Sequence, residues 1–137
     1  MDNKLETLRH SASHIMAEAV VSLFPETKVA IGPSIEEGFY YDFDRKESFT
    51  VDDLSKIEEK MKEIIKENAS FVCSTVSKTE AIKLFEEKGE KYKVELANVI
   101  EGDTVTFYQS GKFIDLCKGP HVKSTGEVKY FKLLSVA

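Results

Sequence analysis

The sequence contains little cysteine, and it has no long apolar run. Its two cysteines, Cys73 and Cys117, do not form a C-x-x-C pair, so we expect free thiols, as is typical of a reducing compartment. No apolar stretch reaches the length of about 18 residues that spans a bilayer, and the N-terminal region lacks the pattern of a signal peptide. We therefore expect a soluble, cytoplasmic protein with no membrane partner.

Positive charge is also scarce. There are 19 lysines and arginines against 24 acidic residues, a net charge of −5. This balance argues against a strong stand-alone nucleic-acid binder, because phosphate affinity comes largely from basic side chains. Residues 110–137 depart from the average, with five lysines against two acids; such an end could contact a phosphate or serve only solubility. The absence of a Walker loop and of G-x-G-x-x-G removes the simplest nucleotide-binding interpretations.

Helical and strand-like periodicities alternate along the chain. The 137 residues and the 42% hydrophobic content are typical of one globular domain. The N-terminal helix is expected to be the longest, with an apolar stripe at spacings of three and four. The predicted fold is a single α+β domain, with a mainly antiparallel sheet packed against this helix and further helices. Helices are predicted at 3–24, 50–68, 77–88 and 91–97, and extended segments at 28–35, 38–44, 71–76, 104–109, 112–116 and 127–137.

The chain has only three histidines, and all of them fall in two spaced motifs. These are His10-x-x-x-His14 near the start and Cys117-Lys-Gly-Pro-His121 near the end. The spacing of four places both imidazoles of the first motif on one side of the helix. The second motif follows a predicted strand and forms a loop, a common position for chemistry. We expect folding to bring the two motifs into one cleft.

Three interpretations of this constellation remain open from the residues alone. His10, His14, Cys117 and His121 match a tetrahedral zinc site in ligand type, either structural or hydrolytic. The same groups could position a water and a substrate without metal, with a histidine as general base. They could also be ordinary residues of a helix surface and a turn. Cys73, in contrast, is predicted to be a buried small hydrophobe in mid-strand.

Six motifs are distributed along the chain: Leu8-Arg-His10-Ser-Ala-Ser-His14, Ala30-Ile-Gly-Pro33, Gly38-Phe-Tyr-Tyr-Asp42, Gly89-Glu-x-Tyr-Lys93, Asp115-Leu-Cys117-x-Gly-Pro-His121 and Phe131-Lys-Leu-Leu-Ser-Val-Ala137. Together they resemble one known family, the editing domain of bacterial or eukaryotic threonyl-tRNA synthetases. That domain is related to the second additional domain of alanyl-tRNA synthetases. The resemblance covers nearly the whole chain, and it implies an editing domain over residues 1–137, excised from a larger synthetase and lacking the aminoacylation and anticodon-binding domains.

The resemblance implies hydrolysis of serine mistakenly esterified to threonine tRNA, while threonyl-tRNA is spared. Serine lacks one methyl group of threonine, a difference worth only about 1–3 kcal/mol in a binding pocket, so a second sieve is useful. The implied partners are the acceptor end of tRNA(Thr) carrying serine and the remainder of the synthetase in cis. The catalytic residues carried over by motif are His10, His14, Lys93, Cys117 and His121, and the substrate-binding residues are Tyr41 and Asp115.

The resemblance also bears on the metal and on the roles of single residues. Relatives of the alanyl type hold zinc with this pattern, whereas the threonyl type is expected to require no cofactor. We hypothesise that Lys93 and a histidine hold the attacking water and that Asp115 anchors the α-ammonium group; without the family, these two would be an ordinary surface lysine and a strand-end acid. The alternatives are a zinc-binding aminoacyl-tRNA deacylase of the alanyl type, a zinc hydrolase for an unrelated ester, and a non-catalytic module that binds the acceptor end.

Overall fold

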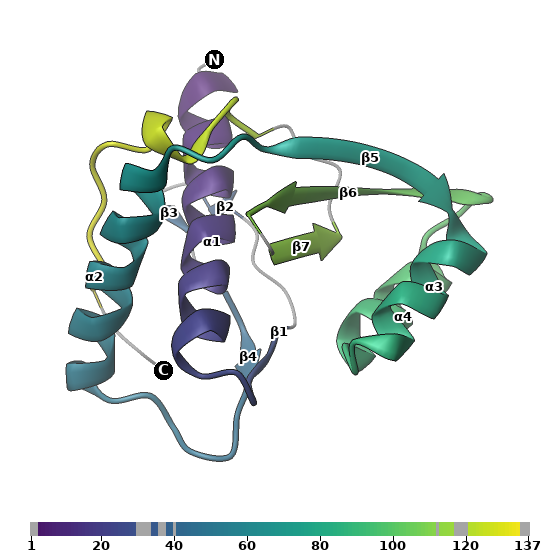
Figure 1. Cartoon of the computed structure of the whole chain (residues 1–137), viewed down its shortest axis with the longest axis horizontal. Helices are drawn as coiled ribbons and strands as arrows, with labels where there is room; N and C mark the ends of the chain where they lie inside the picture. Colours follow the sequence, from purple (N-terminus) through teal and green to yellow (C-terminus); the bar gives the residue numbers. More distant parts are fainter. Residues whose placement is uncertain are drawn as a thin grey trace.

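The long N-terminal helix is the centre of the computed structural model, which describes residues 3–29, 34–35, 38–39, 41–111, 113–116 and 121–134. This helix, α1 (Asn3–Leu23), stands between α2 and the largest sheet (Figure 1). Small side chains make its middle turns narrow, and burial extends around most of its circumference rather than along one stripe. The buried residues of α1 are Ser11, Ala12, Ser13, His14, Ile15, Ala17, Ala19 and Val20.

The second helix, α2 (Val51–Glu67), packs beside α1 and contributes Ile57, Met61 and Ile64 to a shared apolar core. Its first turn carries a capping box, since the Thr50 hydroxyl accepts from the Asp53 amide at 3.2 Å and the Asp53 carboxylate accepts from the Thr50 amide at 2.9 Å. Its end is fixed by Asn68 in the left-handed conformation. These local signals explain why the sequence predicts both ends of this helix.

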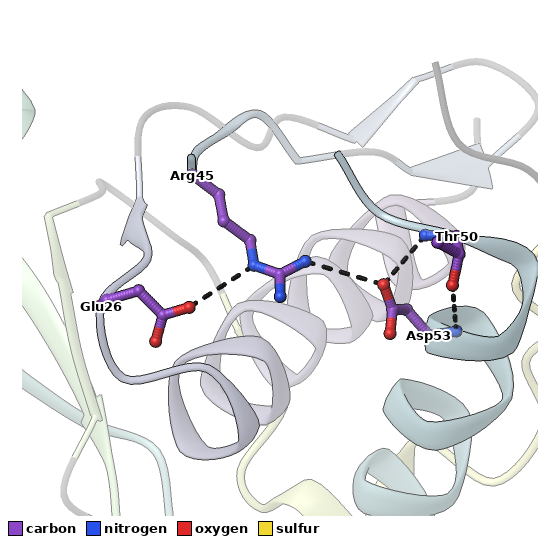
Figure 2. A network of polar contacts seen from close by, with 4 residues as sticks. All are labelled: Glu26, Arg45, Thr50 and Asp53. Atoms are coloured by element: carbon purple, nitrogen blue, oxygen red, sulfur yellow. Dashed lines mark hydrogen bonds and ion pairs between the residues drawn. The ribbon is translucent and has the colours of Figure 1, made fainter. Parts of the chain in front are cut away.

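Arg45 ties the start of α2 to the chain segment that follows α1 (Figure 2). Its guanidinium lies 3.6 Å from the carboxylates of both Glu26 and Asp53. It also lies over the rings of Phe24 and Phe49, at 4.1 and 4.9 Å from their centres. The capping carboxylate is thus held by the helix terminus and by the arginine together.

Replacing Thr50 with alanine is expected to lower the free energy of unfolding by about 1 kcal/mol, because an amide at the start of α2 loses its side-chain acceptor. Urea denaturation measures the change. Ser48→Ala, an exposed position just before the helix, is the matched control and should leave stability unchanged. Equal losses in the two variants would show that the capping hydroxyl contributes nothing specific.

The largest sheet has the order β5-β6-β7, and both of its pairings are antiparallel. Its strands are β5 (Val72–Ser77), β6 (Thr104–Ser110) and β7 (Phe113–Leu116). Two helices, α3 (Lys78–Glu87) and α4 (Lys91–Val99), pack together at one end of this sheet (Figure 1). Their buried residues Ala81, Phe85 and Ala97 form a second core with the strands. Ser77 caps α3 and Gly89 follows it with φ of +71°, as the sequence predicts.

Two short ladders occupy the connection between α1 and α2. Here β1 (Lys28–Val29) pairs with β4 (Phe43–Asp44), and β2 (Ser34–Ile35) pairs with β3 (Gly38–Phe39). The expectation of one continuous strand over 38–44 is therefore wrong. The two ends of that segment pair with different partners, which a local alternation of side chains does not specify.

Two further local expectations are also wrong. Cys73 is exposed rather than buried. The neighbouring Val72, which points to the opposite face, is exposed as well, so neither face of the sheet is covered at the start of β5. The predicted strand over 127–137 is, where described, a 3-10 turn, η1 (Thr125–Glu127), followed by irregular chain. That chain is fixed partly by the Leu133 amide, which donates to Glu58 at 2.9 Å.

A small apolar cluster of Ala17, Val29 and Phe113 forms a third core. The Tyr92 hydroxyl adds a polar link, since it donates to Asp44 at 2.8 Å and so ties α4 to β4. The predicted fold class, a single α+β domain with antiparallel pairing, is confirmed. Within the described segments, no helix combines the length and apolarity needed to cross a bilayer.

Candidate active site

The three histidines meet, although the first and last are 111 positions apart in the sequence. The ring centre of His121 lies 4.5 Å from that of His10 and 5.1 Å from that of His14. His10 and His14 come from successive turns of α1, and His121 comes from the chain that follows β7. The structure thus brings together these parts of the two motifs; Cys117 lies outside the described residues.

Aromatic rings enclose two of these imidazoles. His14 makes edge contacts with Phe71 and Phe113, at 5.0 and 4.9 Å between ring centres. His121 stacks on Phe71 at 4.9 Å and meets Tyr108 edge-on at 4.6 Å. His14 is only 1% exposed. The histidine cluster is therefore packed where α1 meets the sheet β5-β6-β7.

Burial at this junction keeps both imidazoles neutral. Burial, together with the positive charges of Lys93 and His10, lowers the pKa of His14 to about 3. Burial also lowers the pKa of His121 to about 3, together with the charges of His14 and His10, while Asp115 acts in the opposite direction. At neutral pH each of these rings has one N–H donor and one nitrogen that can accept a hydrogen bond.

Lys93, Asp115 and Tyr41 form the second part of the site. The Lys93 ammonium lies 3.6 Å from Asp115 Oδ1, and the two side chains are only 3% and 14% exposed. The Tyr41 hydroxyl donates to Asp115 Oδ2 at 3.0 Å. Lys93 also lies over the ring of Phe113, 5.2 Å from its centre, and that ring contacts His14 as well. Lys93 is therefore not an ordinary surface lysine.

A groove of about 1270 Å³ runs along α1, and Tyr41 is the predicted site residue that lines it. Its walls come from one side of α1, the 38–43 segment, α2 and the C-terminal chain. Tyr41 stacks on Phe43 in this wall, with ring centres 5.0 Å apart. The tyrosine thus connects the groove to Asp115 and Lys93.

The described histidines make hydrogen bonds and ring contacts with protein groups. The rings of His10 and His121 are inclined by only 34° and lie partly over one another, and Nδ1 of His121 lies 3.0 Å from the Ser11 hydroxyl. Nε2 of His14 lies 3.0 Å from the Ser110 hydroxyl. In the part of the chain that the structure describes, no group of three or more His, Cys, Asp or Glu side chains could hold a metal ion.

Sequence reasoning missed several residues around these imidazoles. Ser11 accepts from the Val122 amide at 3.0 Å, so it also anchors the chain beside His121. Ser110 contacts His14 and donates to Glu18 at 2.7 Å. Glu18 could have been predicted from the sequence, because it continues the spacing of four from His10 and His14 along one helix face. The roles of Ser110 and Phe113 depend on tertiary contacts, so no sequence pattern pointed to them.

Known proteins resemble this chain along its length. Residues 105–137 match the family model of the threonyl and alanyl tRNA synthetase second additional domain. The threonine–tRNA ligase of Carboxydothermus hydrogenoformans is 56% identical over 137 residues, which are 99% of the chain and 22% of that ligase. The ligase of Acetivibrio thermocellus is 56% identical over 133 residues, covering 96% of the chain and 21% of the ligase. That of a Geobacillus species is 51% identical over 138 residues, covering 100% and 21%.

The similarity to threonine–tRNA ligases along nearly the whole chain, together with the matched C-terminal segment, relates the chain to the second additional domains of aminoacyl-tRNA synthetases. The chain spans about a fifth of the length of the relatives it matches. Within that class it belongs to the threonyl-tRNA synthetase family, which confirms the predicted resemblance.

Proposed function

We propose that this chain hydrolyses the ester of serine mischarged on threonine tRNA and spares threonyl-tRNA. The observation that carries the proposal is the meeting of three histidines with a buried Lys93–Asp115 pair around Phe113. Neutral imidazoles beside a buried cation can orient a water and stabilise the negative charge that develops on an ester carbonyl. The family of the chain supports an aminoacyl-tRNA as the substrate.

The proposed reaction needs water as its only second reactant. The water oxygen bonds to the ester carbonyl carbon, and the bond from that carbon to the ribose oxygen breaks. One proton of the water ends on the ribose oxygen, and the other is released with the serine carboxylate. In this mechanism Lys93 and a histidine hold the water, and protein side chains activate it without a metal ion.

Asp115 is assigned to the α-ammonium group of the substrate. Lys93 and Tyr41 each engage one of its oxygens, and a carboxylate offers about four acceptor positions, so further positions remain for an ammonium. The acceptor end of tRNA(Thr) is the proposed partner, and the rest of a cytoplasmic synthetase would act in cis. Steric exclusion of the threonine methyl group would supply the discrimination.

His10→Ala is expected to slow serine release from Ser-tRNA(Thr) by about 100-fold or more, because a group that contacts the reaction centre is lost. The measurement is the release of labelled serine and of labelled threonine by the chain at high concentration, with and without chelator. Lys83→Ala, an exposed position on α3, is the control. Unchanged release in His10→Ala would favour the non-catalytic acceptor-end module, and loss of release with chelator would favour the zinc deacylase.

A further inference from the structure

Glu18, Ser110 and His14 form a hydrogen-bonded chain that crosses from α1 to the end of β6. The Ser110 hydroxyl donates to Glu18 Oε1 at 2.7 Å, and its oxygen lies 3.0 Å from Nε2 of His14. A serine hydroxyl has one hydrogen. Because that hydrogen is given to Glu18, the contact with His14 requires a proton on Nε2 of the imidazole.

The opposite nitrogen of the same ring is then a bare acceptor. Neutral imidazole carries one N–H, so Nδ1 of His14 has a lone pair and no proton. Among the described residues, Nδ1 has no hydrogen-bond partner although it is buried. A buried acceptor without a donor costs about 1–3 kcal/mol. A donor that arrives with the substrate would remove this cost.

We propose that Glu18 and Ser110 are positioning residues that hold His14 in the Nε2–H tautomer, so that Nδ1 accepts a hydrogen bond from the attacking water. This assignment rests on the proposed ester hydrolysis for the identity of the water, but not for the tautomer. It names which histidine holds the water and which of its nitrogens does so. It also gives a role to the helix face that continues from His10 through His14 to Glu18.

Ionisation of the two flanking groups agrees with this direction of donation. Burial holds the pKa of His14 at about 3, so its ring is neutral when the carboxylate is charged. Burial raises the pKa of Glu18, and the hydrogen bond from Ser110 acts against that rise by favouring the carboxylate. A charged carboxylate is a strong acceptor for the serine hydroxyl.

The test is a two-bond ¹H–¹⁵N correlation spectrum of the chain with labelled histidine, which distinguishes the two tautomers of His14. The chain itself should show Nε2–H. Glu18→Leu removes the acceptor for the Ser110 hydroxyl, which can then donate to His14, so the Nδ1–H tautomer should appear and serine release should fall about tenfold or more. Glu18→Gln keeps an acceptor oxygen and should retain both the tautomer and most of the activity.

Glu6→Leu, at an exposed position in the first turn of the same helix, is the matched control and should change neither readout. An Nδ1–H tautomer in the unsubstituted chain, or an unchanged tautomer in Glu18→Leu, would overturn the inference. The two proposals fail separately. A correct tautomer without any release of serine contradicts only the proposed function, whereas release of serine with the wrong tautomer contradicts only the role of Glu18 and Ser110.

Discussion

Replacing Lys93 with methionine is expected to lower the free energy of unfolding by about 3–5 kcal/mol, because it leaves the Asp115 carboxylate buried without its cation. Lys93 and Asp115 are 3% and 14% exposed, so water replaces little of the lost interaction. The Tyr41 hydroxyl still donates to Asp115, but a single neutral donor does not balance a buried charge. Urea denaturation at neutral pH measures the loss.

The double variant Lys93→Met/Asp115→Asn should recover much of this stability. Asparagine removes the charge and keeps an oxygen that can accept from Tyr41. Replacement of a whole buried ion pair by neutral groups is often nearly neutral, in contrast to the removal of one partner. Equal losses in the single and double variants would show that the stability of this region does not depend on the pairing of the two charges.

The same helix supplies the matched control. Lys91 lies two residues before Lys93 and pairs with Asp44 at 3.1 Å, yet these side chains are 62% and 44% exposed. Exposed ion pairs contribute little, because water and salt screen them. Lys91→Met should therefore leave the unfolding midpoint unchanged within error. A comparable loss in Lys91→Met would show that α4 is sensitive to any change rather than to the buried charge.

The sequence predicts the helices better than the strands, and the reason is local. The ends of α2 and α3 carry their own signals in Thr50, Asp53, Ser77 and Gly89, which act within one turn. The segment 38–44 has the alternation of a strand, but its pairing is decided by two different partners. Cys73 lies in a strand with apolar neighbours, but only the tertiary structure shows that neither face of the sheet is covered at this point.

The residues of the candidate site also differ in how far the sequence predicts them. The spacing of His10 and His14 places them on one helix face, and the small number of histidines suggests His121 as their partner. Lys93 and Asp115 came only from the family resemblance, since nothing in their neighbourhood predicts that a lysine of a short helix is buried. Ser110 could not be predicted at all, because its role depends on the position of β6 relative to α1.

The stability of the domain is expected to fall steeply between pH 7.5 and 5, because unfolding releases two histidines that are buried in the neutral form. The pKa values of His14 and His121 are about 3 in the folded state, against 6.5 for the free side chain. Over this window the unfolded state binds more protons than the folded state, so the free energy of unfolding decreases as the pH falls. The expected loss is about 2 kcal/mol for His14 and less for the partly exposed His121.

Carboxylates do not account for a loss of stability between pH 7.5 and 5. The pKa values of Asp44, Asp53 and Glu58 are lowered by hydrogen bonds, from Tyr92 and the backbone amides of Thr50 and Leu133 respectively. Their stabilising contribution is therefore lost only below about pH 4.5, near their unfolded pKa values. Glu18 affects stability in the opposite direction, because its raised pKa favours proton uptake by the folded state as the pH falls.

His14→Phe separates the histidine contribution from the rest. Phenylalanine can pack between Phe71 and Phe113 but binds no proton, so the variant should lose at least half of the pH dependence between 7.5 and 5. Urea denaturation at four pH values gives the slope of the free energy of unfolding against pH for the unsubstituted chain and for the variant. A flat profile in the unsubstituted chain would mean that the folded and unfolded states bind protons equally over this range, so that burial does not lower the pKa values of the imidazoles. The same result would remove the support that burial of neutral imidazoles gives to the proposed hydrolysis.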